Sequence, residues 1–187
     1  MNEAHEHCGS DEWREVVRSV ILPWALDEVD LGDDVLEVGP GYGATTDVLA
    51  ESLAQLTAVE IDPELAQRLI DRFEDRAAVN VVVGDATKLP YPDERFSGAV
   101  ALTMLHHVPT AELQNRLFRE VARVLRGGGA FVAFDGVGSP ELEAHHEGDT
   151  YNPIDPHALA DRLRDAGFAT VDVKANDFGW ASVARKP

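Results

Sequence analysis

Short apolar stretches alternate with amphipathic segments along the chain, and this alternation constrains the fold more than any other feature. The apolar stretches are typical of buried strands, and the segments between them repeat with the period of an α-helix. Strands that are separated by helices pair in parallel through right-handed crossovers, so helices cover both faces of the sheet. The sequence therefore predicts an α/β three-layer sandwich.

The predicted elements also define the end of the sheet. Strands are predicted at 34–38, 56–60, 79–83, 98–103, 130–135, 169–174 and 179–184. Helices are predicted at 11–29, 44–54, 63–73, 110–125 and 156–166, with Pro23 kinking or dividing the first and the glycines at 127–129 ending the fourth. Only a short turn separates the last two strands, so we expect one antiparallel strand in an otherwise parallel sheet.

Length and composition indicate one domain in a reducing compartment. The chain has 187 residues, of which 44% are hydrophobic, and this is enough for one substantial core. It contains no apolar run of about 20 residues, and its first residues lack the charged-then-apolar pattern of a signal peptide. Cys8 is the only cysteine and cannot form an internal disulfide. We therefore expect a cytoplasmic protein that does not associate with membranes.

The charge of the chain argues against a nucleic-acid partner. The formal net charge is −18, from 16 basic and 34 acidic residues. Lysine occurs only at positions 88, 174 and 186, and the arginines are scattered among acids, so no basic stripe is available for a phosphate backbone. We expect a small-molecule partner, and a monomer or a homodimer.

Glycines and carboxylates follow the predicted strands at the edge where such sheets bind ligands. Gly39, Gly41 and Gly43 follow the first strand, where they permit positive φ and a close approach of a ligand to the backbone. The second strand ends at Glu60, 19 residues after Gly41, a spacing typical of a carboxylate that binds ribose hydroxyls. Asp85 follows the third strand and can accept a hydrogen bond from an exocyclic amine such as that of adenine. Together these residues favour a ligand that contains adenosine.

Five stretches resemble class I S-adenosylmethionine-dependent methyltransferases, and among them the ubiquinone-biosynthesis-like group of small-molecule enzymes (methyltransferase type 11). They occur in the family's order between about residues 33 and 135, and the combination is more specific than any one of them. The stretches are Val35-Leu-Glu-Val-Gly-Pro-Gly-Tyr-Gly43, Ala58-Val-Glu-Ile-Asp-Pro63, Gly84-Asp-Ala86 with Leu89-Pro-Tyr-Pro-Asp93, Leu102-Thr-Met-Leu-His-His-Val108, and Leu117-Phe-Arg-Glu-Val-Ala-Arg-Val-Leu-Arg-Gly-Gly-Gly129.

The resemblance implies a Rossmann-like sheet of seven strands in the order 3-2-1-4-5-7-6, with strand seven antiparallel. It implies a cofactor, S-adenosylmethionine, with the three glycines beside the methionine moiety, Glu60 on the ribose, and Asp85 with the Ala86 amide on the adenine. Glu37, Ile61 and Thr103 lie within the matching stretches and complete the predicted cofactor-binding set. The resemblance also divides the single domain, residues 1–187, into an N-terminal helix or flap (1–30), a cofactor-binding core (31–135), and an acceptor loop with a C-terminal hairpin (136–187).

Two departures from related patterns narrow the function. Ser97 stands where the family often has an aspartate at the start of the fourth strand. The Asn-Pro-Pro-Tyr type of motif shown by base-modifying N-methyltransferases is absent, and 103–106 read Thr-Met-Leu-His instead. The Glu-Ile-Asp element is similar to that of ribosomal-RNA adenine dimethylases, but without that motif, and at this net charge, an RNA substrate is disfavoured.

Histidines are the candidate catalytic residues. Methyl transfer by in-line displacement needs alignment above all, and a base helps where the acceptor must lose a proton. His106 and His107 follow the fourth strand, beside the expected position of the methyl group, while His146 and its neighbour His145 could supply the base from the segment after strand five. Packing of these side chains without a catalytic role is the alternative. We predict no metal site, because neighbouring histidines rarely chelate one ion together.

Two other functions remain open on the sequence alone. One is a nicotinamide-dependent oxidoreductase, which the glycine spacing, Asp85 and the lack of a substrate domain disfavour. The other is a non-catalytic protein that binds S-adenosylmethionine, since cofactor binding alone does not establish turnover.

Overall fold

The computed structural model describes residues 3–187 and contains a seven-stranded sheet in the order β3-β2-β1-β4-β5-β7-β6. β7 pairs antiparallel with β5 and with β6, and the other pairs are parallel. The strands are β1 (Asp34–Val38), β2 (Gln55–Glu60), β3 (Val79–Val83), β4 (Phe96–Leu102), β5 (Leu125–Asp135), β6 (Thr170–Ala175) and β7 (Trp180–Arg185). The predicted fold class and strand order are confirmed.

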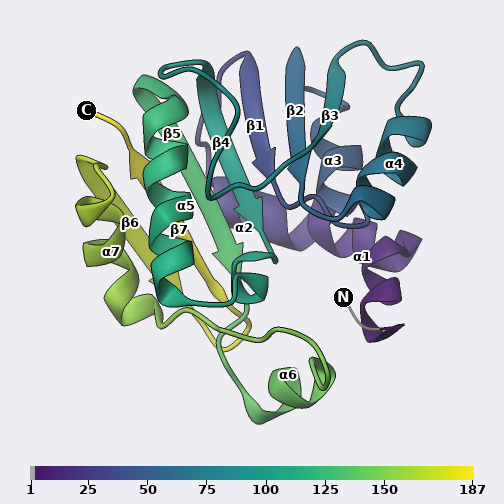
Figure 1. Cartoon of the computed structure of the whole chain (residues 1–187). Helices are drawn as coiled ribbons and strands as arrows, with labels where there is room; N and C mark the ends of the chain where they lie inside the picture. The colour runs from purple at the N-terminus through teal and green to yellow at the C-terminus, as the bar shows by residue number, and fades with distance from the viewer. Residues whose placement is uncertain (1–2) are drawn as a thin grey trace.

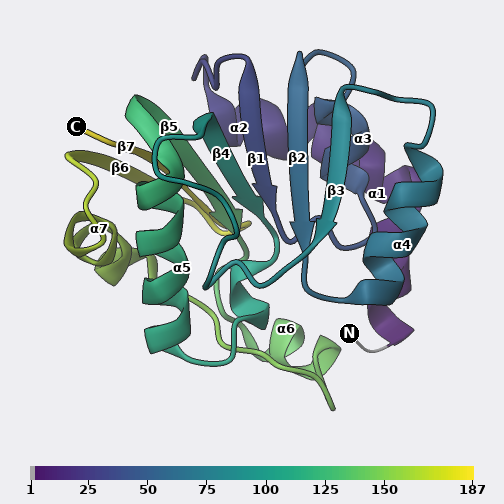
Figure 2. The ribbon, with the colours of Figure 1, turned by 45° about the horizontal axis from the view of Figure 1, so that its top comes forward.

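Helices flank the sheet on both faces (Figures 1 and 2). They are η1 (Glu3–Gly9), α1 (Asp11–Val16), η2 (Val17–Ile21), α2 (Leu22–Leu26), α3 (Ala44–Leu49), α4 (Pro63–Arg72), η3 (Leu105–His107), α5 (Ala111–Val124), α6 (Pro140–His145) and α7 (Pro156–Asp165). One hydrophobic core lies between the sheet and α5 with α7, and a second lies between the sheet and the segments α1, η2, α2 and α3. Within residues 3–187 no helix has both the length and the apolar character that crossing a bilayer requires.

Local chemistry explains where the longer helices begin. Ser10, Asp62, Thr110 and Asp155 each stand at an N-cap, where the side chain accepts a hydrogen bond from a backbone N–H of the first turn. Proline follows Asp62 and Asp155 at the first helical position, where its missing N–H costs nothing. Such caps are each worth about 1 kcal/mol of helix stability.

Three local predictions were wrong. The helix predicted at 11–29 is divided beside Pro23, as predicted, by the π-helical turn η2, but it ends at Leu26 and not at Val29, because Asp27 adopts φ 42°. The glycines at 127–129 lie inside β5 and do not end α5, because the chain becomes extended at Leu125. A Cβ at Gly129 would stand 2.8 Å from the carbonyl oxygen of Ser97, so glycine is required where β5 passes the irregular start of β4. The segment 140–145, for which no helix was predicted, forms α6.

Ser97 has a structural role at the start of β4. Its hydroxyl accepts a hydrogen bond from the Asp34 N–H (2.9 Å), and it lies within hydrogen-bond distance of the Leu31 (2.8 Å) and Asp34 (3.0 Å) carbonyl oxygens. It therefore fixes the entry to β1 against β4.

The carboxyl ends of β1 to β5 share one edge of the sheet. In Figure 1 their arrowheads point toward the side on which the N-terminal segment and α6 lie. Segments that are distant in sequence therefore meet at this edge, beside the loops that follow β1, β2 and β4.

Candidate functional site

A cavity of about 850 Å³ opens at the carboxyl edge of the sheet. Its lining includes Gly39, Gly41 and Tyr42 from the loop after β1, and Glu60 to Asp62 from the end of β2. It also includes residues from η1, η3 and the segment that contains α6. One continuous space therefore joins the glycine loop to the histidine-rich segments.

The glycine loop adopts the backbone conformation that the sequence predicted. Gly39, Gly41 and Gly43 have φ values of 65°, 55° and 84°, which residues with a Cβ rarely adopt. A Cβ at Gly39 would lie 2.8 Å from Met104 Cε. Gly43 is also the N-cap of α3, so this helix begins directly after the loop, beside the cavity.

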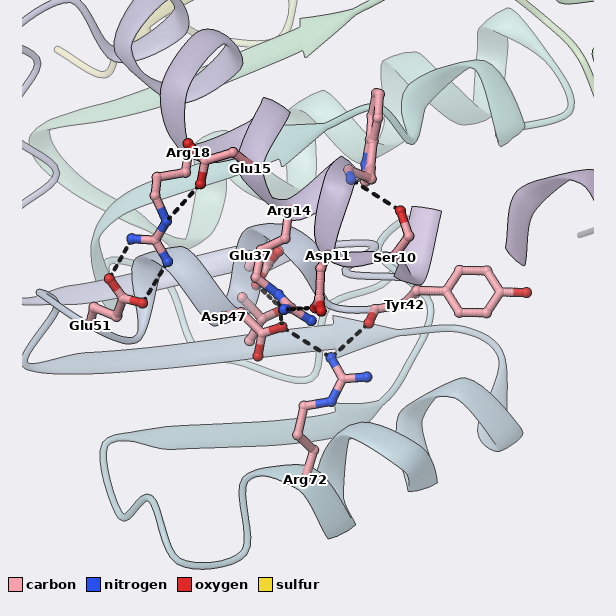
Figure 3. A network of polar contacts seen from close by, with 12 residues as sticks. Ser10, Asp11, Arg14, Glu15, Arg18, Glu37, Tyr42, Asp47, Glu51 and Arg72 are labelled. Atoms are coloured by element: carbon pink, nitrogen blue, oxygen red, sulfur yellow. Dashed lines mark hydrogen bonds and ion pairs between the residues drawn. The ribbon is translucent and has the colours of Figure 1, made fainter. Parts of the chain in front are cut away.

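An ion-pair network anchors this loop to the N-terminal helix (Figure 3). Asp47 Oδ2 on α3 accepts from Arg14 Nε (2.8 Å) and from Arg72 Nη1 (3.3 Å). Arg72 Nη1 also donates to the Tyr42 carbonyl oxygen at 2.9 Å. The network thus ties α1, α3 and α4 around the glycine loop, and it holds η1, which precedes α1, over the cavity.

Glu60 presents a nearly buried carboxylate to the cavity. Oε2 accepts from the Gly41 N–H and Oε1 from the Asp62 N–H, both at 2.9 Å. A carboxylate oxygen has two lone pairs, so each oxygen can also accept from a hydroxyl. Glu60 is therefore held in place by the backbone and is equipped to bind a vicinal diol such as a ribose.

Glu37 lies beneath the glycine loop and not in the cavity lining. It is 2% exposed, and its Oε2 accepts a hydrogen bond from the Thr46 hydroxyl at 2.7 Å. Burial raises the pKa of Glu37 to about 8, although the Thr46 hydrogen bond opposes this shift and the nearby charges of Glu60 and Asp47 add to it. A positive charge near the loop would favour the ionised form.

The other predicted cofactor residues differ in their access to the cavity. Ile61, which is 69% exposed, and Thr103 both belong to the lining. Thr103 has φ 54°, and its N–H donates to the Phe134 carbonyl oxygen. Asp85 and Ala86 are not part of the lining, and Asp85 Oδ1 accepts from the Thr87 N–H at 2.8 Å.

Four histidines from three segments gather in this cavity. They are His5 on η1, His106 and His107 on η3, and His146 immediately after α6. The ring centroids of His106 and His107 are 4.2 Å apart, and those of His106 and His146 are 4.8 Å apart. His5 lies 4.9 Å from His107 and 4.7 Å from His146. The structure thus brings together the three predicted catalytic histidines and adds a fourth.

Backbone contacts hold two of these segments together. The Asn152 N–H donates to the His106 carbonyl oxygen (2.7 Å), and Asn152 Nδ2 donates to the Val108 carbonyl oxygen (3.0 Å). Buried Gln114 Nε2 donates to the carbonyl oxygens of Leu105 and Asn152. The loop after α6 is therefore fixed against η3.

Asp135, at the end of β5, orients His106. Its Oδ1 is 2.6 Å from His106 Nδ1, and its Oδ2 accepts from the His106 backbone N–H at 3.0 Å. The carboxyl group is only 2% exposed, and Oδ1 also accepts from the Gly136 N–H. With Nδ1–H directed at the carboxylate, Nε2 of His106 carries the lone pair.

The remaining histidines of the group stay neutral near pH 7. Burial, together with the positive charges that the neighbouring histidines can carry, lowers the pKa of His107 to about 3. Burial also lowers the pKa of His5 and of His146.

Sequence reasoning missed two members of this site. Asp135 ends a buried strand at the ligand-binding edge, which is the rule that identified Glu60, and the same rule could have found it. His5 lies within the predicted N-terminal helix or flap (1–30), and no local pattern links it to the other histidines. His145, named as a rival base, is exposed and borders the cavity.

The sequence matches the model of the methyltransferase domain family, type 11, over residues 36–133. This segment is just over half of the chain and contains the glycine loop, Glu60, Asp85 and the η3 histidines. The chain therefore belongs to this family of class I S-adenosylmethionine-dependent methyltransferase domains, and S-adenosylmethionine is the family's cofactor.

Individual relatives share sequence with this chain, and solved structures share its fold. The chain is 41% identical over 102 residues to ribosomal RNA small subunit methyltransferase A of Synechococcus sp. (strain WH7803), a match covering 52% of this chain and 36% of the relative. The crystal structure of PH0226 from Pyrococcus horikoshii OT3 superposes with a TM-score of 0.82 at 17% identity, over 100% of both chains. Phosphoethanolamine N-methyltransferase 2 of Haemonchus contortus, in complex with phosphomonomethylethanolamine and S-adenosylhomocysteine, gives a TM-score of 0.70 at 16% identity, over 85% of this chain and 50% of that one. The chain matches about a third of the length of the curated relatives.

Proposed function

We propose that this protein transfers the methyl group of S-adenosylmethionine to a small-molecule acceptor by in-line displacement. The observation that carries the proposal is the single cavity that contains both the glycine loop with Glu60 and the histidine group. Its volume of about 850 Å³ lies within the range of roughly 300–1,000 Å³ for small-ligand sites. Cofactor and acceptor can therefore meet in this one space.

The residues beside the glycine loop fit this cofactor. We assign the methionine moiety to the loop formed by Gly39, Gly41 and Gly43, and the ribose hydroxyls to the free lone pairs of Glu60. Buried Glu37 is assigned to the amino group of the methionine moiety, whose positive charge favours ionisation of this carboxyl group. Asp85 and the Ala86 amide are assigned to the adenine, with Ile61 and Thr103 along the cofactor's length. The cofactor itself supplies the electrophilic methyl group.

The charge of the chain and the lining of the cavity support a small acceptor. RNA binding requires Lys and Arg side chains that displace counterions, whereas this chain has a net charge of −18. The acceptor side is bordered by His7 and Cys8 of η1 and by Glu141 and Leu142 of α6, none of which is a basic side chain of the Lys or Arg type. We therefore propose a metabolite as acceptor, although the Synechococcus relative is named for ribosomal RNA.

His106 is the proposed general base, and Asp135 is its positioning residue. The hydrogen bond from Nδ1–H to the carboxylate fixes the ring orientation and stabilises the imidazolium that forms when Nε2 accepts a proton. The low pKa of His107 makes it a weaker proton acceptor than an ordinary imidazole. His146, which lies immediately after α6, is the alternative base.

Two measurements test the proposal. Calorimetry should show binding of S-adenosylmethionine and S-adenosylhomocysteine but not of NAD. Binding of NAD and of neither other ligand would support an oxidoreductase. Cofactor carrying a labelled methyl group is then incubated with a cell extract that is separated into metabolites, RNA and protein. Label should enter the metabolite fraction and depend on the intact protein. Label in RNA would refute the acceptor assignment, and cofactor binding without transfer to any fraction would favour a non-catalytic binding protein.

A further inference from the structure

Nitrogen atoms of four histidines converge in the cavity from three separate parts of the chain. His5, His106, His107 and His146 each offer one ring nitrogen, and these atoms all lie within 4.8 Å of one another. His5 and His146 are only 4% and 5% exposed. Neighbouring histidines rarely converge, but the 3-10 turn η3 holds the rings of His106 and His107 4.2 Å apart.

The hydrogen bonds of the group leave lone pairs where an ion would need them. His106 Nδ1 is bonded to Asp135, and His146 Nδ1 lies 2.6 Å from the Leu142 carbonyl oxygen, which only an N–H can approach as a donor. Each of these rings therefore carries its lone pair on Nε2. His146 Nε2 and His107 Nδ1 are buried and have no hydrogen-bond partner within residues 3–187. Buried polar atoms are ordinarily satisfied, so such nitrogens indicate that a ligand completes the site.

We propose that these four histidines bind one divalent transition-metal ion, with Zn²⁺ as the reference ion. Imidazole nitrogen is a preferred ligand of Zn²⁺, Cu²⁺, Ni²⁺ and Co²⁺, whereas Mg²⁺ and Ca²⁺ prefer oxygen. A tetrahedral zinc with bonds of about 2.0–2.1 Å places its nitrogen ligands about 3.3 Å apart. The group contracts toward this spacing by side-chain rotation when the ion binds.

The surroundings of the group match those of protein metal sites. Ligating histidines usually donate their second N–H to a carboxylate or a carbonyl oxygen, which fixes the tautomer and the ring orientation. Asp135 does this for His106 and the Leu142 carbonyl oxygen does it for His146. Asp149 Oδ2 lies 3.8 Å from His5 Nδ1 and adds a second carboxylate beside the four imidazoles.

Ion binding joins η1, η3 and the segment after α6 and so closes the acceptor side of the cavity. It also engages the lone pair of His106, so the ion-loaded protein cannot use that nitrogen as a base. The metal site stands on the geometry of the histidines alone and does not depend on methyl transfer.

The first test is metal titration of the protein without an affinity tag and after removal of metals by a chelator. Zn²⁺ in calorimetry should bind with one equivalent per chain, and Co²⁺ should give the intense visible bands of a tetrahedral, nitrogen-ligated ion. His146→Gln and His107→Gln should each weaken binding at least tenfold, whereas His145→Gln, the matched change at the next position to His146, should retain the wild-type affinity. Unchanged S-adenosylhomocysteine binding shows that each variant is folded.

A second test needs no variant. Zn²⁺ should protect the four histidines of the unaltered protein from carbethoxylation by diethyl pyrocarbonate, as read by mass spectrometry, and should leave exposed His157 reactive. The proposal is overturned by the absence of saturable one-equivalent binding, by a Co²⁺ spectrum of octahedral oxygen ligation, or by equal protection of His157. It is also overturned if His145→Gln weakens binding as much as His146→Gln, or if His146→Gln binds like the wild type. These measurements use no acceptor, so a failure of methyl transfer leaves their outcome unaffected.

Discussion

Replacement of Glu37 by Gln should change how the stability of the protein depends on pH. The carboxyl group is buried, and its pKa is raised to about 8 in the folded protein from 4.5, first by burial. Between pH 4.5 and 8 the folded chain therefore retains a proton that the unfolded chain releases. This proton stabilises the fold fully below the unfolded pKa, and the contribution is lost as the pH rises through the folded pKa.

The magnitude follows from the linkage between protonation and folding. One proton of difference lowers the free energy of unfolding by about 1.4 kcal/mol per pH unit within that window. Glutamine keeps the size of the side chain and an oxygen for the Thr46 hydroxyl, but it does not titrate. The free energy of unfolding of Glu37→Gln minus that of the wild type should therefore increase from pH 5 to pH 8, by at most about 4 kcal/mol.

Urea unfolding of both proteins at intervals between pH 5 and pH 9 measures this difference. Subtracting the wild-type value cancels the titration of the other acidic residues, because both proteins contain them. Thr46→Val is the matched comparison, because it removes the hydrogen bond that lowers the pKa of Glu37 and keeps the shape of the side chain. In Thr46→Val the free energy of unfolding should continue to fall up to a higher pH than in the wild type, because the pKa of Glu37 is higher. In Glu37→Gln this fall should instead be absent. A difference between Glu37→Gln and wild type that does not vary with pH would refute the reasoning.

Four further predictions concern ligand binding and turnover. Glu60→Ala should weaken cofactor binding at least tenfold in calorimetry, because two charge-assisted hydrogen bonds of about 1.5–3 kcal/mol each are lost, and an unchanged dissociation constant would contradict the ribose assignment. Asp85→Ala should weaken binding by less, since one contact is assigned to it, and an inosine analogue that binds as well as the adenosine cofactor would exclude the adenine role. Cofactor binding below pH 8 should release a proton from the wild type but not from Glu37→Gln, as calorimetry in buffers of different ionisation enthalpy would show, because the cationic amino group favours ionised Glu37. His106→Ala should lower turnover about a hundredfold with little change in cofactor affinity, and Asn should not restore it; full activity of the Ala variant would remove the base from the mechanism.

The sequence was sufficient for the sheet because each strand carries its own signal. The burial of β5 on both faces is visible in the apolar run at 130–134, and the short turn before β7 predicts the reversed strand, while the order of the strands is what the family resemblance implies. The boundaries that failed depend on tertiary contacts. Gly129 was expected to end a helix, yet it lies in β5, where the nearby Ser97 carbonyl oxygen leaves no room for a Cβ.

The histidine group shows which part of a site follows from topology and which part does not. Because β4 and β5 are neighbours in the predicted strand order, the loops that follow them must meet, and this brings His106 and His107 toward His146. His5 lies instead on η1, which precedes α1, and the contacts that hold α1 on α3 include the Arg14–Asp47 ion pair. A prediction of such pairing from sequence would have to choose Asp47 among 34 acidic residues. The first three histidines were therefore accessible to sequence reasoning through the order of the strands, whereas the fourth required the packed structure.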